Sequence, residues 1–245
     1  MRILALYSVK GGVGKTTAAV NLATLSALHG RRTLLLDLDP QGAATWLMEG
    51  GLPAGGVRQA LKGKDLDQRL METRYRNLSL WPNGPDWADM ALEMAGMKHA
   101  GERLARLLER MGTRFDHVVL DCPPGLGLMA DNIFEAADDL LVPLIPAPLS
   151  LRAAQQVREA LAARKDAPVM QAFLAMVDRR RGLHRDFLAA HRADLPELLP
   201  AAIPASSEIE RQTVTRVPIV HAQPRSELAQ AYYQLWRAVH VPLAD

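Results

Sequence analysis

Cysteine and aromatic residues are scarce in this sequence: Cys122 is the only cysteine among 245 residues, and aromatic residues make up 5% of the chain. A single cysteine excludes an intrachain disulfide. Long apolar runs are also lacking, because proline, aspartate or arginine interrupts each of them well short of the ~20 residues that a membrane span needs. No apolar signal core precedes the first strand pattern after Met1. We therefore expect a cytoplasmic protein in which Cys122 is a small packed side chain.

The sequence also has little excess charge of either sign. Its formal net charge is +2, with 49% hydrophobic and 23% charged residues. This is the balance of a folded globular chain, and it excludes a global electrostatic field that would attract nucleic acid, so any basic patch must be local. An α/β chain of this length can bury a sizeable core as one unit, so we expect a single domain over residues 1–245.

Apolar runs of strand length alternate with segments of helical spacing along the chain. The first strand–helix–strand unit is expected at 3–9, 16–29 and 33–38. Further strands are expected at 78–81, 116–120, 140–145, 169–177 and 201–203, and further helices at 100–111, 127–137, 149–165, 189–193, 207–214 and 226–239. This alternation predicts an α/β fold with a mostly parallel, doubly wound sheet and helices on both faces.

The segment Lys10–Thr17, with the sequence KGGVGKTT, lies between the first expected strand and the first expected helix. Glycines in such a loop let successive backbone N–H groups turn around phosphate oxygens, and the helix N-terminus adds its positive end. Lys15 can reach the β- and γ-phosphates, and the Thr16 hydroxyl can bind Mg²⁺. The segment predicts a fold of the P-loop NTPase type, with the nucleotide-binding residues Gly11, Gly12, Val13, Gly14, Lys15, Thr16 and Thr17.

Three aspartates stand where strands are expected to end. Asp37 and Asp39 are two residues apart, a spacing that directs strand side chains the same way, and Asp121 follows the apolar run 118–120. Because ligands of α/β sheets bind at the carboxyl ends of the strands, these carboxylates can serve one metal–phosphate site. Taken alone, however, an Asp-Pro pair is equally typical of a turn, and apolar strands often end in aspartate by chance.

The start of the P-loop departs from the general pattern. The position five residues before Gly14, normally glycine, is Val9, and a second lysine, Lys10, follows it. With this pattern the sequence resembles the ParA/MinD group of P-loop ATPases, whose hallmark is this additional lysine. The segments DPQG at 39–42 and DCPPG at 121–125 resemble the ParA branch, and the resemblance covers essentially the whole chain. It implies an ATPase with ATP and Mg²⁺ as cofactors.

The resemblance also implies roles for individual residues. Lys10 would cross a face-to-face dimer to the phosphates of the partner's ATP, so that Lys10, Lys15 and Asp39 form the catalytic set, with Asp39 orienting the attacking water. Thr16, Asp37 and Asp121 would hold Mg²⁺ and its hydration shell. Pro204, in the segment AIP at 202–204, resembles the loop that borders adenine.

The ParA branch implies a partition or cargo-positioning function. The ATP-bound homodimer would bind nonspecific double-stranded DNA, and a ParB-like adaptor would accelerate slow hydrolysis, so we expect the protein to be associated with the nucleoid. Because Met1 directly precedes the first strand pattern, we expect no helix-turn-helix extension for operator binding. DNA contacts would come from basic residues of the carboxyl-terminal portion, for which the candidates are Arg179, Arg180, Arg181, Arg185, Arg211 and Arg216.

Three rival classes share this scaffold. A MinD-like ATPase that works at a membrane surface needs a basic amphipathic tail, but the segment 235–242 has one arginine, no lysine and Pro242, so we expect the last helix to pack on the core. An iron–sulfur reductase needs cluster ligands, and a dimer would offer one Cys122 from each subunit. A metabolic ligase or synthetase needs a second substrate pocket that no motif announces.

Overall fold

The computed structural model describes residues 1–49, 57–64, 66–84, 90–178, 180–182, 184, 187 and 195–240. Within these residues eight strands form one sheet in the order β3-β4-β2-β5-β1-β6-β7-β8. All neighbouring strands run parallel except β3 and β4. The strands are β1 (Arg2–Leu6), β2 (Thr33–Asp37), β3 (Met71–Glu72), β4 (Leu78–Trp81), β5 (His117–Asp121), β6 (Asp139–Leu144), β7 (Val169–Val177) and β8 (Leu198–Pro204).

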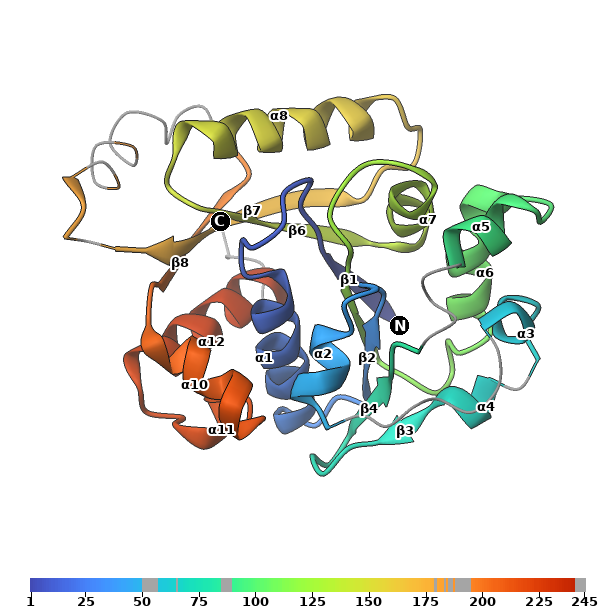
Figure 1. Ribbon diagram of the computed structural model, residues 1–245, viewed down its shortest axis with the longest axis horizontal. Coiled ribbons are helices and arrows are strands. Elements are labelled where there is room, and N and C mark those ends of the chain that lie inside the picture. Colours follow the sequence, from blue (N-terminus) through green and yellow to red (C-terminus); the bar gives the residue numbers. More distant parts are fainter. Residues whose placement is uncertain are drawn as a thin grey trace.

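Helices cover both faces of the sheet (Figure 1). One face packs against α1 (Lys15–Leu28), α2 (Ala43–Leu47), α11 (Ile219–Ala222) and α12 (Glu227–His240). The other packs against α3 (Val57–Leu61), α5 (Met90–Ala95), α6 (Arg103–Glu109), α7 (Leu128–Ala136) and α8 (Pro148–Ala162). The remaining described helices are α4 (Leu66–Arg69), the 3₁₀ turn η2 (Ala100–Glu102) and α10 (Ser207–Thr215). The predicted fold class, a mostly parallel sheet between two helical layers, is confirmed.

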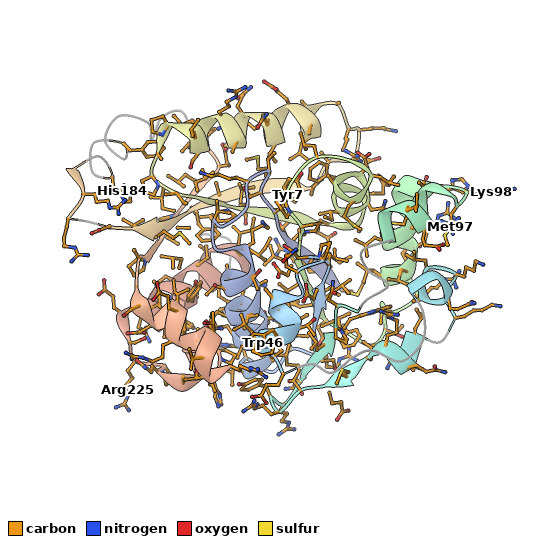
Figure 2. The ribbon with its side chains drawn as sticks, in the orientation of Figure 1. Tyr7, Trp46, Met97, Lys98, His184 and Arg225 are labelled. Atoms are coloured by element: carbon orange, nitrogen blue, oxygen red, sulfur yellow. The ribbon has the colours of Figure 1, made fainter. Side chains whose placement is uncertain are left out.

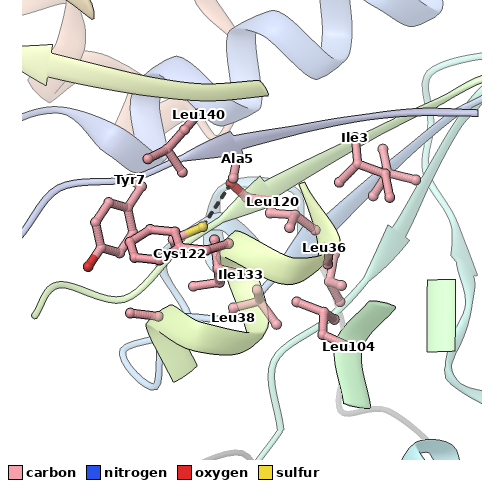
Figure 3. Close-up of a cluster of buried hydrophobic side chains, with 14 of the residues drawn as sticks. Ile3, Ala5, Tyr7, Leu36, Leu38, Leu104, Leu120, Cys122, Ile133 and Leu140 are labelled. Atoms are coloured by element: carbon pink, nitrogen blue, oxygen red, sulfur yellow. Dashed lines mark hydrogen bonds between the residues drawn. The ribbon is translucent and has the colours of Figure 1, made fainter. Parts of the chain in front are cut away.

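Two hydrophobic clusters form the core, one on each face of the sheet. Strand alternation divides β1 between them: Leu4 and Leu6 belong to the cluster under α1, and Ile3 and Ala5 belong to the cluster under α7. Cys122 is fully buried in the second cluster, where its thiol lies 3.6 Å from the carbonyl oxygen of Leu120 (Figure 3). Cys122 is therefore the packed residue that the sequence predicts, and its burial raises the pKa of the thiol.

The strands at 78–81 and 169–177 have the predicted bounds, and the expected helix at 100–111 begins as the turn η2 before it continues as α6. Six short elements were missed because each is shorter than the window over which periodicity can be recognised: α2, α3, α4, α5, α11 and β3. The helix expected at 189–193 lies outside the described residues. A single domain over residues 1–245 stays a prediction.

Candidate nucleotide-binding site

The loop from β1 to α1 has the backbone geometry of a phosphate-binding turn. Gly12 and Gly14 adopt left-handed conformations, with φ of +70° and +91°, which are strained for residues with a side chain. Gly14 is also the N-cap residue of α1, and no side chain caps this helix. The first backbone N–H groups of a helix have no acceptor within it, so this 14-residue helix begins with donors available to an anion.

A cleft of about 630 Å³ opens beside this loop. It is lined by Gly11, Gly12, Val13, Gly14, Lys15, Thr16, Thr17, Asp39, Pro40, Gln41, Pro123, Pro124 and Met176. The sequence motifs at 10–17, 37–42 and 121–125 thus all contribute residues to one cleft, although Asp37 and Asp121 are not among the residues that line it.

The two lysines of the loop occupy different environments. Lys15 lines the cleft and is only 6% exposed. Lys10 is exposed and is not among the residues that line the cleft; its backbone N–H donates to the Ser8 hydroxyl at 3.2 Å. Lys15 is therefore placed to reach a ligand of its own chain, whereas the Lys10 side chain is free to reach outward.

Asp37 and Asp121 end neighbouring strands and pair across β2 and β5. Both are fully buried, but their surroundings differ. Asp37 accepts hydrogen bonds from the backbone N–H and hydroxyl of Thr45, both at 2.7 Å, and from the N–H of Asp39 at 3.2 Å. Burial raises the pKa of Asp37 to about 6, and these hydrogen bonds oppose the shift.

Asp121 accepts no backbone N–H as Asp37 does: neither of its buried carboxylate oxygens makes a well-formed hydrogen bond within the described part of the chain, and the Thr16 hydroxyl is the nearby polar group that favours its charged form. Burial, and then the negative charge of Asp37, raise the pKa of Asp121 to about 8, against the opposing influence of the Thr16 hydroxyl and Lys15. A buried carboxylate without partners is costly unless a cation or its bound water completes it. Thr16, Asp37 and Asp121 therefore fit a hydrated Mg²⁺, a cation that prefers oxygen ligands and keeps part of its water shell.

Asp39 is placed differently from the sequence expectation. Strand β2 ends at Asp37, so Asp39 lies in the following loop, half-buried, and does not continue the alternation of the strand. Its Oδ1 accepts a hydrogen bond from the N–H of Gln41 at 3.0 Å, and it lines the cleft. Strand alternation therefore does not set the direction of the Asp39 side chain: Asp37 accepts the N–H groups of Asp39 and of Thr45 on α2, whereas Asp39 borders the space where a nucleotide would lie.

Met176, near the end of β7, was missed by the sequence analysis. Its φ of +55° is unusual for a residue with a side chain. Met176 lines the cleft beside the P-loop and also a second cleft of about 620 Å³, which includes Asp178 and Ala205. Pro204 lines a third cleft of about 470 Å³ that shares Asp178 and Ala205 with the second. The clefts follow one another along the ends of β7 and β8, so Pro204 does not border the phosphate cleft directly.

The described candidates for DNA binding have different surroundings. Arg180 and Arg181 both pair with Asp178, at 3.1 and 3.6 Å, and the backbone N–H of Asp178 donates to Nδ1 of His184, which Figure 2 labels. Arg211 is exposed on α10, and the Arg216 guanidinium lies 3.3 Å from the ring centre of Trp46 on α2. Arg179 and Arg185 lie outside the described residues. Two of the four described candidates are thus partly neutralised by a carboxylate.

The described part of the last helix packs on the core. Leu228, Ala229, Tyr232, Leu235, Trp236 and Val239 are all buried, and they join the cluster under α1. The apolar face of α12 is therefore occupied within the chain. No helix among the described residues has the length and apolar character that crossing a membrane requires.

The fold and the site define a P-loop nucleotide-binding protein: a glycine loop leads from the first strand into a helix, a buried lysine lines the cleft, and carboxylates end the two adjacent strands. A family model described as an AAA domain matches residues 1–171. The chain is 30% identical to the chromosome partitioning protein ParA of Caulobacter vibrioides over 256 residues, which cover 98% of this chain and 94% of that protein.

Two further similarities are informative. The chain is 36% identical to the chromosome partitioning protein ParA of Myxococcus xanthus, but only over 146 residues, 58% of this chain and 52% of that protein. A Mycobacterium smegmatis structure described as cobyrinic acid a,c-diamide synthase, with bound ATP analogue and magnesium, is 30% identical, with a TM-score of 0.83 and coverage of 98% of this chain and 94% of that one. The chain belongs to the ParA/MinD family of P-loop ATPases.

Proposed function

We propose that this chain binds ATP with Mg²⁺ in the cleft beside the P-loop and hydrolyses it as a partition or cargo-positioning ATPase. The observation that carries this proposal is the carboxylate of Asp121, which is buried at the end of β5 near Thr16 and Lys15 without a hydrogen-bond partner among the described residues. Thr16, Asp37 and Asp121 would hold the cation, which neutralises charge that develops on the phosphates during transfer. Lys15 would bind the phosphates, and Asp39, at the rim of the cleft, would orient water.

The exposed position of Lys10 supports a dimer as the active form. In the ParA/MinD family the additional lysine acts across a face-to-face dimer, and an exposed Lys10 side chain beside the cleft is available for that contact. ATP would then hold two chains together, and hydrolysis would release them. A second copy would also bring a second set of arginines, which doubles the phosphates neutralised and couples the nucleotide state to DNA affinity.

The dimer is tested by light scattering of the purified chain with ATP and Mg²⁺. We expect ATP to double the mass, Lys15→Gln to abolish nucleotide binding and dimerisation together, and Lys10→Ala to abolish dimerisation while ADP still binds. Asp39→Ala should trap the dimer because hydrolysis stops. Lys98→Ala, which removes another exposed lysine (Figure 2), is the control and should behave as the unchanged chain. A monomeric Asp39→Ala chain at saturating ATP would refute the assignment.

DNA binding is tested by an ATP-dependent mobility shift with random duplex. Arg211→Ala combined with Arg216→Ala should weaken DNA binding and make it depend less steeply on salt concentration. Each phosphate contact that is lost reduces the number of counterions released when the protein binds. Arg225→Ala, an exposed arginine outside the predicted set (Figure 2), is the matched control. The same protein is offered to anionic vesicles. ATP-dependent binding to vesicles but not to DNA would favour the MinD-like alternative. The packing of the apolar face of α12 on the core argues against that alternative.

The likeness to the Mycobacterium smegmatis chain favours a second candidate, an ATP-dependent synthetase. The two candidates differ in what ATP turnover requires. A partition ATPase hydrolyses ATP without a small-molecule acceptor and is stimulated by DNA together with an adaptor protein. A synthetase turns over ATP only with its acid and nitrogen substrates. Basal hydrolysis in buffer, unaffected by cobyrinic acid and glutamine, would exclude the synthetase.

A further inference from the structure

Two residues outside the predicted motifs, Thr45 of α2 and Asn83 after β4, hold the loop that carries Asp37 and Asp39. The hydroxyl of Thr45 donates to Asp37 Oδ2 at 2.7 Å, and the backbone N–H of Thr45 donates to the same oxygen at 2.7 Å. The backbone N–H of Asn83 donates to the Thr45 hydroxyl at 2.7 Å. The side-chain amide of Asn83 donates to the carbonyl oxygen of Asp39 at 2.8 Å.

The directions of these hydrogen bonds restrict the conformation of the loop that carries Asp37 and Asp39. A threonine hydroxyl has one proton, and because Asp37 accepts it, Asn83 must supply the proton of the second bond. The carbonyl oxygen of Asp39 also accepts the N–H of Gly42 at 2.8 Å, so both lone pairs of that oxygen are engaged. Gly42 has φ of +63°, and a side chain there would meet Asn83 at 3.6 Å. The loop is therefore fixed both to α2 and to the end of β4.

We propose that Thr45 and Asn83 are positioning residues for nucleotide hydrolysis. Thr45 fixes the Asp37 carboxylate, and Asn83 fixes the main chain of Asp39 so that its carboxylate stays at the rim of the cleft. The proposal rests on the proposed function, because it assigns work to the same site. It divides that work: the Thr45 contact acts on the cation-binding carboxylate, and the Asn83 contact acts on the water-orienting one.

Two substitutions separate these contacts. Thr45→Val keeps the shape of the side chain and removes the hydroxyl, and it should raise the Mg²⁺ concentration for half-maximal hydrolysis about tenfold, as is typical when support behind a metal ligand is lost. Thr45→Ser should restore the parent value. Asn83→Ala keeps the backbone bond to Thr45 and should lower kcat about tenfold at saturating Mg²⁺, with the KM for ATP within twofold, since it displaces only the group that orients water.

A second measurement is independent of activity. Amide hydrogen exchange of the apo chain should be faster in the peptide that covers Gln41 and Gly42 when Asn83 becomes alanine. Thr24→Val is the matched control for Thr45→Val: Thr24 is equally a helical threonine, and its hydroxyl donates to the Val20 carbonyl oxygen at 2.8 Å, outside the cleft. This control should leave exchange in that peptide and the Mg²⁺ requirement unchanged.

The outcomes distinguish the two proposals. If the unchanged chain binds ADP but does not hydrolyse ATP under any condition, the proposed function fails, and exchange alone decides whether Asn83 holds the loop. If the unchanged chain hydrolyses ATP and Thr45→Val and Asn83→Ala do so with the same kcat and Mg²⁺ requirement, the positioning proposal is overturned. Should Asn83→Ala not fold, Asn83→Leu, which is close in size and removes the donor without adding a charge, gives the same test.

Discussion

Strands β1, β2, β5 and β6 carry different chemistry at their two ends. At the amino ends, charges are paired: Arg2 donates to both carboxylate oxygens of Asp139 at 2.5 and 2.9 Å, and Arg32 forms an ion pair with Asp116 at 2.7 Å. At the carboxyl ends, Asp121 is buried with neither carboxylate oxygen paired among the described residues. Ion pairs thus satisfy the charges at the amino ends, whereas at the carboxyl ends β5 finishes in a carboxylate that the described residues leave incomplete.

Aromatic rings close the amino end further. Trp236 of α12 stacks on His29 at 4.2 Å and on His240 at 5.1 Å, and His240 stacks on His117 at the start of β5 at 4.7 Å. The indole N–H of Trp236 donates to the Ser26 hydroxyl at 2.9 Å. This ring stack joins the last helix to α1 and β5, so the carboxyl-terminal segment completes the end of the sheet that lies away from the cleft.

The difference shows how one sheet divides stability from function. Burying a charge without a partner costs stability, and proteins keep such groups where a ligand completes them. The amino end has no need of a ligand and uses ion pairs and stacked rings. Substitutions of the same type at the two ends should therefore have opposite consequences, and four experiments test this contrast.

The largest effect is expected for Trp236→Ala. Removing a buried indole leaves a cavity in the ring stack and should lower the free energy of unfolding by about 3–5 kcal/mol. Trp46→Ala is the matched change at the other end, where Trp46 is 55% exposed beneath Arg216, and should cost less than about 1 kcal/mol. Urea denaturation followed by circular dichroism measures both. Equal losses for the two tryptophans would break the comparison.

Asp121→Asn should affect activity at the opposite end. A neutral amide cannot balance the charge of Mg²⁺, so we expect ATP hydrolysis to fall about 100-fold, corresponding to about 2.7 kcal/mol. The free energy of unfolding of the apo chain should not fall, because the substitution replaces a buried carboxyl group that has no hydrogen-bond partner among the described residues. Steady-state hydrolysis and thermal unfolding are measured on one preparation. A destabilised but active variant would contradict the interpretation of Asp121 as a functional residue.

Asp139→Asn is the counterpart at the amino end of β6, which β1 separates from β5 in the sheet. Asp139 accepts two hydrogen bonds from Arg2 and is almost fully buried, so the variant should lose about 2 kcal/mol of stability. ATP hydrolysis by the folded variant should stay within twofold of the unchanged chain. The two substitutions of aspartate to asparagine, compared in one assay, sharpen the contrast: one loses activity and the other loses stability.

The sequence predicts the functional end better than the stabilising end. A phosphate cradle requires glycines, a lysine and a threonine at fixed spacing, and therefore Lys15 and Thr16 can be recognised from the residue pattern alone. Ring stacking, by contrast, requires no fixed spacing of residue types; it requires only that aromatic side chains meet in the folded chain. Tyr233, Trp236 and His240 lie on one side of α12 by their spacing, but their partner His117 is more than a hundred residues earlier in the chain.

The missed residues of the cleft have a similar explanation. Thr45 and Asn83 act through a hydroxyl and an amide that belong to no motif, and α2, which carries Thr45, is one turn and a half long. A weak signal existed for Asn83, because polar residues after parallel strands gather at the ligand edge of a sheet. Met176 offered no such signal, because nothing in the sequence predicts a left-handed backbone conformation at a methionine.

The smallest effect is expected from the pH dependence of His117. Burial, and then the nearby charges of His240 and Arg31, lower the pKa of His117 from 6.5 to about 4. The unfolded chain therefore binds more protons than the folded chain between about pH 4 and pH 6.5, and the free energy of unfolding must rise with pH across this window. Above pH 6.5 the contribution is complete, and it is lost as the pH falls toward 4.

His117→Gln removes this titration and keeps a polar side chain of similar length. Urea midpoints of the variant and the unchanged chain, measured at intervals from pH 4.5 to 7, should differ by a pH-dependent amount of about 1 kcal/mol, with the unchanged chain gaining stability faster as the pH rises. Asp37, whose pKa of about 6 acts in the opposite direction, is present in both proteins and cancels in the difference. Parallel curves would show that His117 has the same pKa in the folded and unfolded chain. In that case the ring stack would leave the amino end of the sheet open to water.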